Sequence, residues 1–238
     1  MKGLILAGGR GSRLKERTVN TNKCMLSFKG KPLISYSLDC AISTGLTEII
    51  IVVGYRAEDI INQFGIHYQG AKIQYVIQQE RKGLVHAIET ASEALDGADF
   101  MTFLGDEVMH GARHKEMLDY FQDNNLFSVC GVTIPKDRSE VSKTYGILQG
   151  EDNKIFRLIE KPPRPLNNIQ GTGNCLFRNG ILEFIPYTPI SHQRTEKEFP
   201  DLIQCAIDAG HDVRSFSIGT SYKNINTQSE IQYSEENI

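Results

Sequence analysis

Short apolar stretches alternate with longer stretches of helical spacing through the first half of the chain. The short stretches are rich in Ile, Val and Leu, as are strands of a parallel sheet that is buried on both faces. In the longer stretches, apolar residues recur every three to four positions, which predicts helices with one buried side. The expected strands cover residues 2–7, 48–53, 73–77 and 100–104, and the expected helices cover residues 32–43, 57–64, 83–95 and 113–124.

The pattern changes after residue 127. Helical spacing becomes rare, and short strand-like runs follow one another with turns between them. The expected strands here are 127–134, 146–148, 155–159 and 172–177, with helices at 179–185 and 199–209. The sequence therefore predicts an α/β protein with a doubly wound, mostly parallel, Rossmann-like sheet and a small β-rich insertion. We expect a single domain over residues 1–238.

Composition excludes several classes of protein. The chain has 238 residues, of which 40% are hydrophobic and 23% charged, and this length is ample to bury a core without disulfides or structural metals. No apolar run approaches the roughly 18 residues of a membrane span, and the apolar stretch at the N-terminus is too short for a signal peptide. We therefore expect a cytoplasmic protein with no membrane partner.

Charge and cysteine usage narrow the choice of ligands. The formal net charge is −3, and no polybasic field marks a surface for nucleic acid, so nucleic acid is not an expected partner. The five cysteines are scattered and form no CxxC motif or Cys/His pairing, which predicts reduced thiols and no zinc site. A small anion could still bind, because a few local cations and backbone N–H groups suffice for it.

Three glycines follow the first expected strand, in the segment LILAGGRGSRL at residues 4–14. Gly8, Gly9 and Gly11 let the backbone turn sharply and bring consecutive N–H groups against phosphate oxygens. Arg13, just beyond, is placed to contact a phosphate with its guanidinium fork. The dinucleotide fingerprint is broken because Arg13 replaces its third glycine, and a Walker loop fails for lack of GK[ST]. Taken alone, the segment could also be a glycine-rich turn without a ligand.

Further short segments follow in order along the chain. Lys23 begins KCML, Gln78 lies five residues before GLVHA, Asp106 ends LGD, and YGI at 145–147 and EKP at 160–162 come later. Together with L-A-G-G-x-G-x-R-L at residues 6–14, these segments resemble the sugar-1-phosphate nucleotidyltransferases, the family of glucose-1-phosphate thymidylyl- and uridylyltransferases. The resemblance covers roughly residues 1–227. Within KCML it departs at Cys24, where the family usually has proline.

The resemblance implies a fold of the nucleotide-diphospho-sugar transferase type, with a nucleotide-binding half at residues 1–126 and an acceptor-binding half at 127–238. The nucleotide contacts that it implies are Leu6, Ala7, Gly8, Gly9, Gly11, Ser12, Arg13, Gln78, Gly83 and Gly105. The acceptor contacts that it implies are Gly146, Glu160, Lys161 and Asn174. The metal positions are Asp106 and Asn224, and the implied cofactor is Mg²⁺.

The reaction of this family explains the residue types. A phosphomonoester oxygen attacks the α-phosphorus of a nucleoside triphosphate and pyrophosphate leaves, so catalysis consists of positioning and charge neutralisation. By resemblance, Arg13 holds the β- and γ-phosphates, Lys23 neutralises charge on the α-phosphate, Asp106 anchors Mg²⁺, and Lys161 orients the acceptor phosphate. We expect Arg13 and Lys23 to be exposed in the empty cleft.

Several positions depart from the family pattern. In the late W-x-D-I-x-T segment, Tyr222 replaces the tryptophan and Asn224 the aspartate, and an amide oxygen can bind magnesium but brings no charge. Glu107 follows Asp106 where the family often has asparagine, and it could compensate. The family's G-L-Y or G-I-Y becomes Gly173-Asn174-Cys175, which suggests an acceptor other than glucose 1-phosphate.

The leading prediction is a Mg²⁺-dependent enzyme that couples an NTP to a sugar 1-phosphate or a related small phosphorylated acceptor. Gln78 resembles the thymidylyl and uridylyl branches, which favours a pyrimidine base. A cytidylyltransferase acting on a non-glucose phosphate or phosphonate is the alternative within the enzyme class, and a catalytically silent nucleotide-binding subunit is the alternative outside it. The broken fingerprint disfavours a dehydrogenase. The oligomeric state stays open, with a homo-oligomer as one option.

Overall fold

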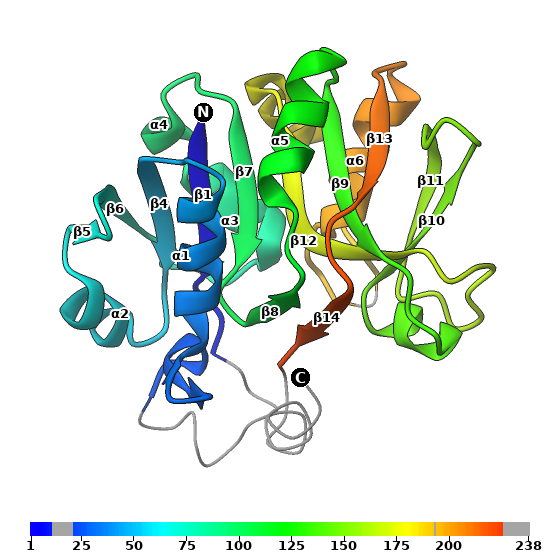
Figure 1. The fold of residues 1–238 in the computed structure, drawn as a ribbon. Coiled ribbons are helices and arrows are strands. Elements are labelled where there is room, and N and C mark those ends of the chain that lie inside the picture. Colours follow the sequence, from blue (N-terminus) through cyan, green and yellow to red (C-terminus); the bar gives the residue numbers. More distant parts are fainter. Residues whose placement is uncertain (11–20, 193, 226–238) are drawn as a thin grey trace.

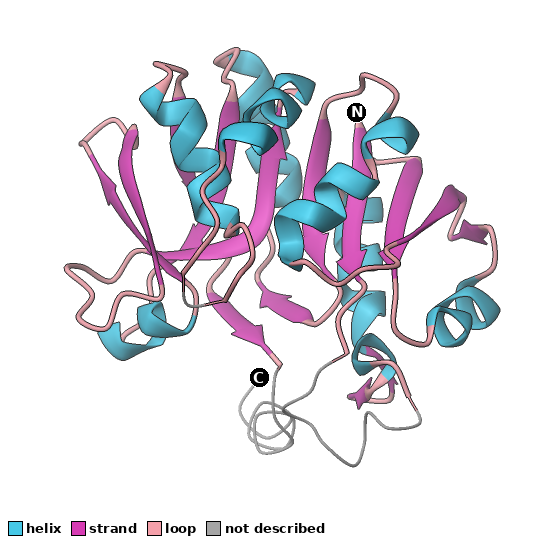
Figure 2. Ribbon diagram, turned by 180° about the vertical axis from the view of Figure 1, so that it is seen from behind, coloured by secondary structure: helices cyan, strands magenta, loops and turns pink. Residues whose placement is uncertain are grey.

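A computed structural model describes residues 1–10, 21–192 and 194–225. A ten-stranded sheet runs through the described chain, with helices on both of its faces, as the two opposite views show (Figure 1; Figure 2). Three of the predicted nucleotide contacts, Gly11, Ser12 and Arg13, lie outside the described residues. In the described part, none of the helices has the length and apolarity that a membrane crossing requires.

The strands and helices follow the expected alternation in the first half. The strands are β1 (Lys2–Ala7), β2 (Ser27–Phe28), β3 (Lys31–Pro32), β4 (Glu48–Val53), β5 (His67–Tyr68), β6 (Ala71–Ile77), β7 (Phe100–Leu104), β8 (Glu107–His110), β9 (Ser128–Thr133), β10 (Tyr145–Gln149), β11 (Ile155–Glu160), β12 (Gln170–Phe177), β13 (Val213–Ser217) and β14 (Ser221–Asn224). The α-helices are α1 (Leu33–Ser43), α2 (Ala57–Phe64), α3 (Gly83–Thr90), α4 (Ser92–Leu95), α5 (His114–Asp123) and α6 (Phe199–Asp208). Three 3-10 segments complete the set, η2 (Lys23–Met25), η3 (Arg138–Lys143) and η4 (Asn179–Tyr187).

The sheet is mixed, which refines the predicted mostly parallel sheet. Its main path runs β11-β10-β12-β7-β1-β4-β6-β5. β1 pairs in parallel with β4 and β7, and β4 in parallel with β6, so the first half has the predicted parallel core. In the second half, β12 pairs antiparallel with β7, β9 and β10, and β9 and β13 form the only parallel pair among the described strands of that half. The α/β prediction is confirmed, and the change of sequence pattern after residue 127 marks the change of pairing.

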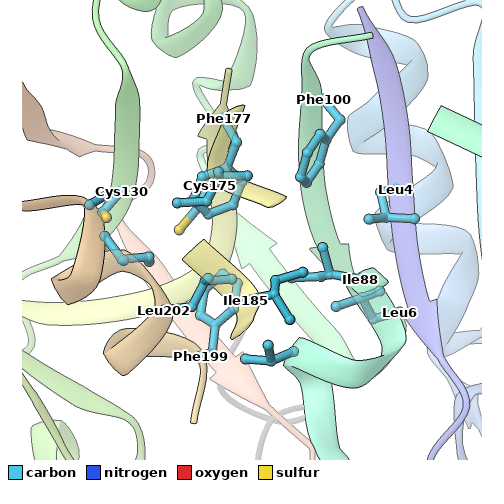
Figure 3. Packing of buried hydrophobic residues seen from close by; sticks show 14 of the residues in the cluster. Leu4, Leu6, Ile88, Phe100, Cys130, Cys175, Phe177, Ile185, Phe199 and Leu202 are labelled. Carbon is cyan, nitrogen blue, oxygen red and sulfur yellow. The ribbon is translucent and has the colours of Figure 1, made fainter. Parts of the chain in front are cut away.

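Both faces of the sheet carry a hydrophobic core. Along β1, Leu4 and Leu6 belong to one core and Ile5 and Ala7 to the other, as the alternation of side chains along a strand requires. Figure 3 shows the first core, in which Phe100 of β7 and Phe177 of β12 lie side by side with ring centroids 5.4 Å apart. Aromatic side chains thus fill the boundary between the two halves. Each fully buried side chain of this size contributes about 1.5–3 kcal/mol to folding.

A second, two-stranded sheet forms at the end toward which β1 runs (Figure 1). β8 pairs antiparallel with β14, and Asn224 stands in register with Glu107. The sequence pattern predicted neither strand. Their pairing brings the last described strand to the residues that directly follow β7.

Candidate active site

A cleft of about 390 Å³ lies between the two halves. The carboxyl ends of β1 and β7 lead into it, which is where open α/β sheets bind ligands. Residues predicted from both halves line it, namely Leu6, Ala7, Gly8, Gly9, Lys23, Gln78, Gly83, Asp106, Glu160, Lys161 and Asn224. The predicted contacts Gly105, Gly146 and Asn174 are not part of the lining.

Gly8 begins the turn after β1 and packs tightly against a polar side chain. A Cβ atom at this position would lie 2.7 Å from Gln78 Oε1, so a residue with a side chain could stay only if Gln78 moved. Gly8 O accepts a hydrogen bond from Tyr55 N at 3.3 Å, which holds the turn against the end of β4. The first part of the predicted phosphate loop is therefore held by its neighbours in the described structure.

Lys23 and Asp106 form an ion pair at the wall of the cleft. Lys23 lies in η2, which Asn22 caps by accepting a hydrogen bond from Cys24 N at 2.8 Å. Asn22 Nδ2 also donates to Tyr55 O at 2.6 Å, which ties the turn to the loop after β4. From there Lys23 Nζ reaches Asp106 Oδ2. A cation and a carboxylate from segments 83 positions apart thus meet near the ends of β1 and β7.

The prediction that Lys23 is exposed in the empty cleft is wrong. The residue is only 5% exposed, because its ammonium group is directed at Asp106 rather than at solvent. The Asp106 side chain retains 21% exposure. A molecule entering the cleft therefore has more access to the carboxylate than to the ammonium group.

Gln78 lies just beyond β6 and is 5% exposed. Its Nε2 donates to Gly83 O at 3.2 Å and lies 2.9 Å from His86 Nδ1. With Nε2 as the donor, His86 Nδ1 accepts, which corresponds to a neutral ring with its proton on Nε2. These contacts fix the orientation of the Gln78 amide and link the end of β6 to the start of α3.

Glu160 is the last residue of β11 and Lys161 follows it, on the opposite side of the cleft. Lys161 has a left-handed backbone, with φ of 40°, and its N–H donates to Thr144 O at 2.7 Å. This bend directs two neighbouring side chains to the same cleft, and Lys161 Nζ lies 3.1 Å from Glu160 Oε1. Arg194, which the sequence analysis missed because no motif marked it, lies 3.7 Å from the same oxygen. Lys143 also lines this side.

Glu107 is the most buried carboxylate of the lining, at 4% exposure. Its Oε1 accepts hydrogen bonds from Gly173 N at 3.1 Å and from Tyr222 Oη, and its Oε2 accepts one from Asn174 Nδ2 at 2.7 Å. Burial raises the pKa of Glu107 to about 8, even though these hydrogen bonds lower it. Asn174 is therefore bound to Glu107 rather than directed into the cleft.

Asn224 and Asp106 lie side by side as a result of the β8–β14 pairing. Asn224 is in register with Glu107, and the N–H of the next residue, Ile225, donates to Asp106 O at 2.9 Å. Both Asn224 and Asp106 line the cleft. The two positions predicted for the metal are thus brought together from strands that the sequence pattern did not reveal.

Replacing His114 by glutamine should make folding less sensitive to acid. His114 Nε2 donates to Asn174 Oδ1 at 2.9 Å, while Nδ1 is buried and has no hydrogen-bond partner among the described residues. Burial lowers the pKa of His114, so the unfolded chain takes up this proton more readily than the folded one. The contribution of His114 to the free energy of unfolding is therefore fully present above about pH 6.5. Below that value it falls by up to about 1.4 kcal/mol per pH unit.

Glutamine can still donate to Asn174 but does not titrate. Urea unfolding at a series of pH values from about 7 down to about 5 should show a shallower loss of stability for His114→Gln than for the wild type. Equal slopes would mean that His114 does not contribute to the acid sensitivity.

Comparison with known proteins shows the family to which the chain belongs. The model of the family described as Nucleotidyl transferase matches residues 2–221. A UTP–glucose-1-phosphate uridylyltransferase of Haloferax volcanii, AglF, is 32% identical over 221 residues, which are 92% of this chain and 88% of that protein. A glucose-1-phosphate thymidylyltransferase of Streptomyces griseus is 31% identical over 94% of this chain, but the chain spans only 62% of that protein's length.

Solved structures share the fold. A UDP-glucose pyrophosphorylase complexed with UDP-glucose superposes with a TM-score of 0.88 at 22% identity, covering 99% of this chain and 97% of the other. A UDP-glucose pyrophosphorylase from Acinetobacter baumanii gives a TM-score of 0.84 at 16% identity, with 98% and 91% of the two chains covered. The family match and the relatives confirm the resemblance that the motifs carried: this chain belongs to the nucleotidyltransferase family.

Proposed function

We propose that this chain joins a pyrimidine nucleoside triphosphate to a sugar 1-phosphate or a related phosphomonoester and releases pyrophosphate. The observation that carries the proposal is the Lys23–Asp106 pair, which lies in one cleft with Gly8 and Gln78 on one side and Glu160 and Lys161 on the other. A nucleotide and a phosphorylated acceptor can meet in such a cleft with a cation and a carboxylate beside them.

The reaction needs no nucleophile from the protein. An oxygen of the acceptor phosphate forms a bond to the α-phosphorus, the bond from that phosphorus to the oxygen of the β-phosphate breaks, and pyrophosphate leaves with the electron pair. Charge increases on the oxygens around the α-phosphorus, and Lys23 is the residue that neutralises it. Because Lys23 is already held by Asp106, little reorganisation is needed at the moment of reaction.

The nucleotide occupies the side of the cleft formed by β1 and β6. The turn at Gly8 and Gly9 presents backbone groups to the phosphates. Gln78, whose amide is oriented by Gly83 and His86, lies where its remaining hydrogen-bonding capacity can read the edge of a pyrimidine. The relatives named for uridylyl and thymidylyl transfer support this choice of base.

The cleft fits a magnesium ion of the kind that nucleotide-binding enzymes use. Mg²⁺ prefers oxygen ligands and is commonly bound by one or two protein groups together with water and substrate phosphates. Asp106 and Asn224 are adjacent lining residues that offer a carboxylate and an amide oxygen, and these would hold the ion. When bound, the ion supplies positive charge to the triphosphate. Among the described residues, no group of three His, Cys, Asp or Glu side chains forms a site made of protein alone.

The two acceptor residues should respond differently to substitution. A carboxylate accepts hydrogen bonds from hydroxyl groups, whereas an ammonium group pairs with phosphate. Glu160→Gln should therefore raise the KM of a sugar 1-phosphate about tenfold or more and leave a phosphorylated acceptor without ring hydroxyls unaffected, while Lys161→Ala should raise the KM of both acceptors by about 10- to 100-fold. The KM values of glucose 1-phosphate and phosphoethanolamine, measured by steady-state kinetics for each variant, test this expectation. Equal losses of both acceptors in Glu160→Gln would show that Glu160 has a structural role.

Pyrophosphate release from each of five NTPs with a panel of sugar phosphates, phosphoalcohols and phosphonates tests the proposal as a whole. We expect turnover with UTP or dTTP and a sugar 1-phosphate. Turnover confined to CTP and an acceptor that is not a sugar would support the cytidylyltransferase alternative. Nucleotide binding by calorimetry without turnover of any pair would support the catalytically silent subunit.

A further inference from the structure

The strongest feature that the proposed reaction does not use is the hydrogen-bond network around Glu107. Its carboxylate connects three separate elements: Glu107 itself begins β8, Gly173 and Asn174 belong to β12, and Tyr222 belongs to β14. A carboxylate can accept about four hydrogen bonds, and three of these are made here. The network therefore joins the acceptor half of the sheet to the strand that follows Asp106.

The contacts require each oxygen of Glu107 to accept a hydrogen bond, because Gly173 N and Asn174 Nδ2 can only donate. His114 Nε2 is 2.9 Å from Asn174 Oδ1, so the other end of that amide, Nδ2, faces Glu107. Gly173 N and the Tyr222 hydroxyl are donors too. A glutamine at position 107 would have to turn its own NH₂ group toward one of these donors, which would leave buried donors unpaired.

The residues of this network coincide with departures from the family pattern. Glu107, Asn174 and Tyr222 are each a residue type that differs from the segment it matches, and in the fold Asn174 and Tyr222 both donate hydrogen bonds to Glu107. Asn224, another departure, is the cross-strand partner of Glu107. A carboxylate is thus missing at position 224 and present at position 107, on the adjacent strand.

We propose that Glu107 is a positioning residue, which holds the acceptor side of the cleft and β14 in place relative to Asp106. This role rests on the proposed function, because the cleft that it shapes is the one assigned to the acceptor. Gly173, which Glu107 binds through its N–H, packs so closely on Leu104 that a Cβ atom would lie 2.3 Å from Leu104 Cγ. Tyr222 lies two residues before Asn224, and Ile225 N donates to Asp106 O. The nucleotide side, at Gly8 and Gln78, is outside the network.

The decisive test is a double-mutant cycle at positions 107 and 174. Glu107→Gln alone should raise the KM of the acceptor and lower kcat, together by about 10- to 100-fold in kcat/KM, as expected when a buried hydrogen-bond donor is left unpaired. The KM of the NTP should change less than about twofold, because the described hydrogen bonds of the Glu107 side chain go to Gly173, Asn174 and Tyr222 and not to Gly8 or Gln78. Asn174→Asp alone would place a second carboxyl group against that of Glu107. It should lower kcat/KM by about as much as Glu107→Gln does.

The double variant Glu107→Gln/Asn174→Asp should recover most of the lost kcat/KM. In it, the carbonyl of the introduced glutamine would accept from Gly173 and Tyr222, and its amide would donate to the introduced aspartate. That aspartate would accept from His114, so every hydrogen bond is restored with the carboxyl group moved to the neighbouring side chain. Glu93→Gln, at an exposed position on α4, is the matched control and should match the wild type. A double variant whose kcat/KM is no better than that of either single variant would refute the proposal.

Two measurements separate this role from a purely structural one and from failure of the proposed function. If Glu107→Gln lowers Tm but leaves the kinetic constants unchanged well below Tm, Glu107 is structural and the proposal is wrong. If the single variants fold poorly, Tyr222→Phe, which removes one donor, should show the same rise in acceptor KM on a smaller scale.

Hydrogen exchange at Gly173 N detects the network without any turnover. It should be faster in Glu107→Gln than in the wild type and return to the wild-type rate in the double variant. Should the wild type turn over no pair of substrates, the proposed function fails while this exchange result still stands.

Discussion

Replacing Lys23 by methionine should lower kcat by about 10²- to 10³-fold, as does the loss of one preorganised group that stabilises transition-state charge. Methionine keeps the length and most of the apolar volume of the lysine side chain but carries no charge. The lysine is 5% exposed and paired with Asp106, so its contribution is made in a site from which water is largely excluded.

Single-turnover measurements of pyrophosphate release with saturating substrates would measure this loss directly. Lys115→Met, on the exposed face of α5, is the control for removing a lysine elsewhere, and its rate should equal that of the wild type. A Lys23→Met variant within a few fold of the wild type would show that the α-phosphate is neutralised by another group.

Asp106→Asn should have the largest effect of any single substitution in the cleft, with turnover reduced by about 10³-fold or more at any Mg²⁺ concentration. The change keeps the shape of the side chain but removes the charge that pairs with Lys23 and that would hold the metal ion. Mn²⁺ binding followed by electron paramagnetic resonance should weaken in parallel. Normal Mn²⁺ affinity in the variant would exclude Asp106 as a metal ligand.

Asn224→Asp adds a carboxylate on β14, whereas Asp106→Asn removes one. A second carboxylate beside Asp106 should lower the Mg²⁺ concentration for half-maximal activity, by about tenfold if the added charge contributes about 1.4 kcal/mol to metal binding. An unchanged midpoint would mean that the side chain at position 224 does not face the ion.

The elements built from long apolar runs could be predicted from the sequence with nearly correct ends. The strand at 48–53 and the helix at 57–64 have the predicted bounds, because a buried parallel strand and a helix with one apolar face leave clear patterns. The run at 179–185 was predicted as helical and forms the longer 3-10 segment η4, which contains Pro186. Spacing cannot distinguish a 3-10 helix from an α-helix over so few turns.

What the sequence could not show depends on contacts between distant segments. β8 and β14 are four residues each, with mixed polar and apolar side chains, and they exist because they pair with each other across more than a hundred positions. For the same reason the network at Glu107 could not be predicted, although Glu107, Asn174 and Tyr222 each differ from the family pattern. The glycine segment, Lys23 and Lys161 could be assigned to a binding cleft from the sequence. The burial of Lys23 could not be predicted, because it depends on where Asp106 lies.

The position of β14 at the end of the described chain has a consequence for the order of folding. During synthesis, β1, β4 and β7 emerge early and can pair, and Lys23 can reach Asp106, before residue 222 exists. Glu107 obtains its hydrogen bond from Tyr222 only after the last described strand has docked, and such contacts of high sequence separation form slowly. A nascent chain can therefore hold the parallel part of the sheet folded for some time, and the wall of the cleft is complete only after the last described strand has docked.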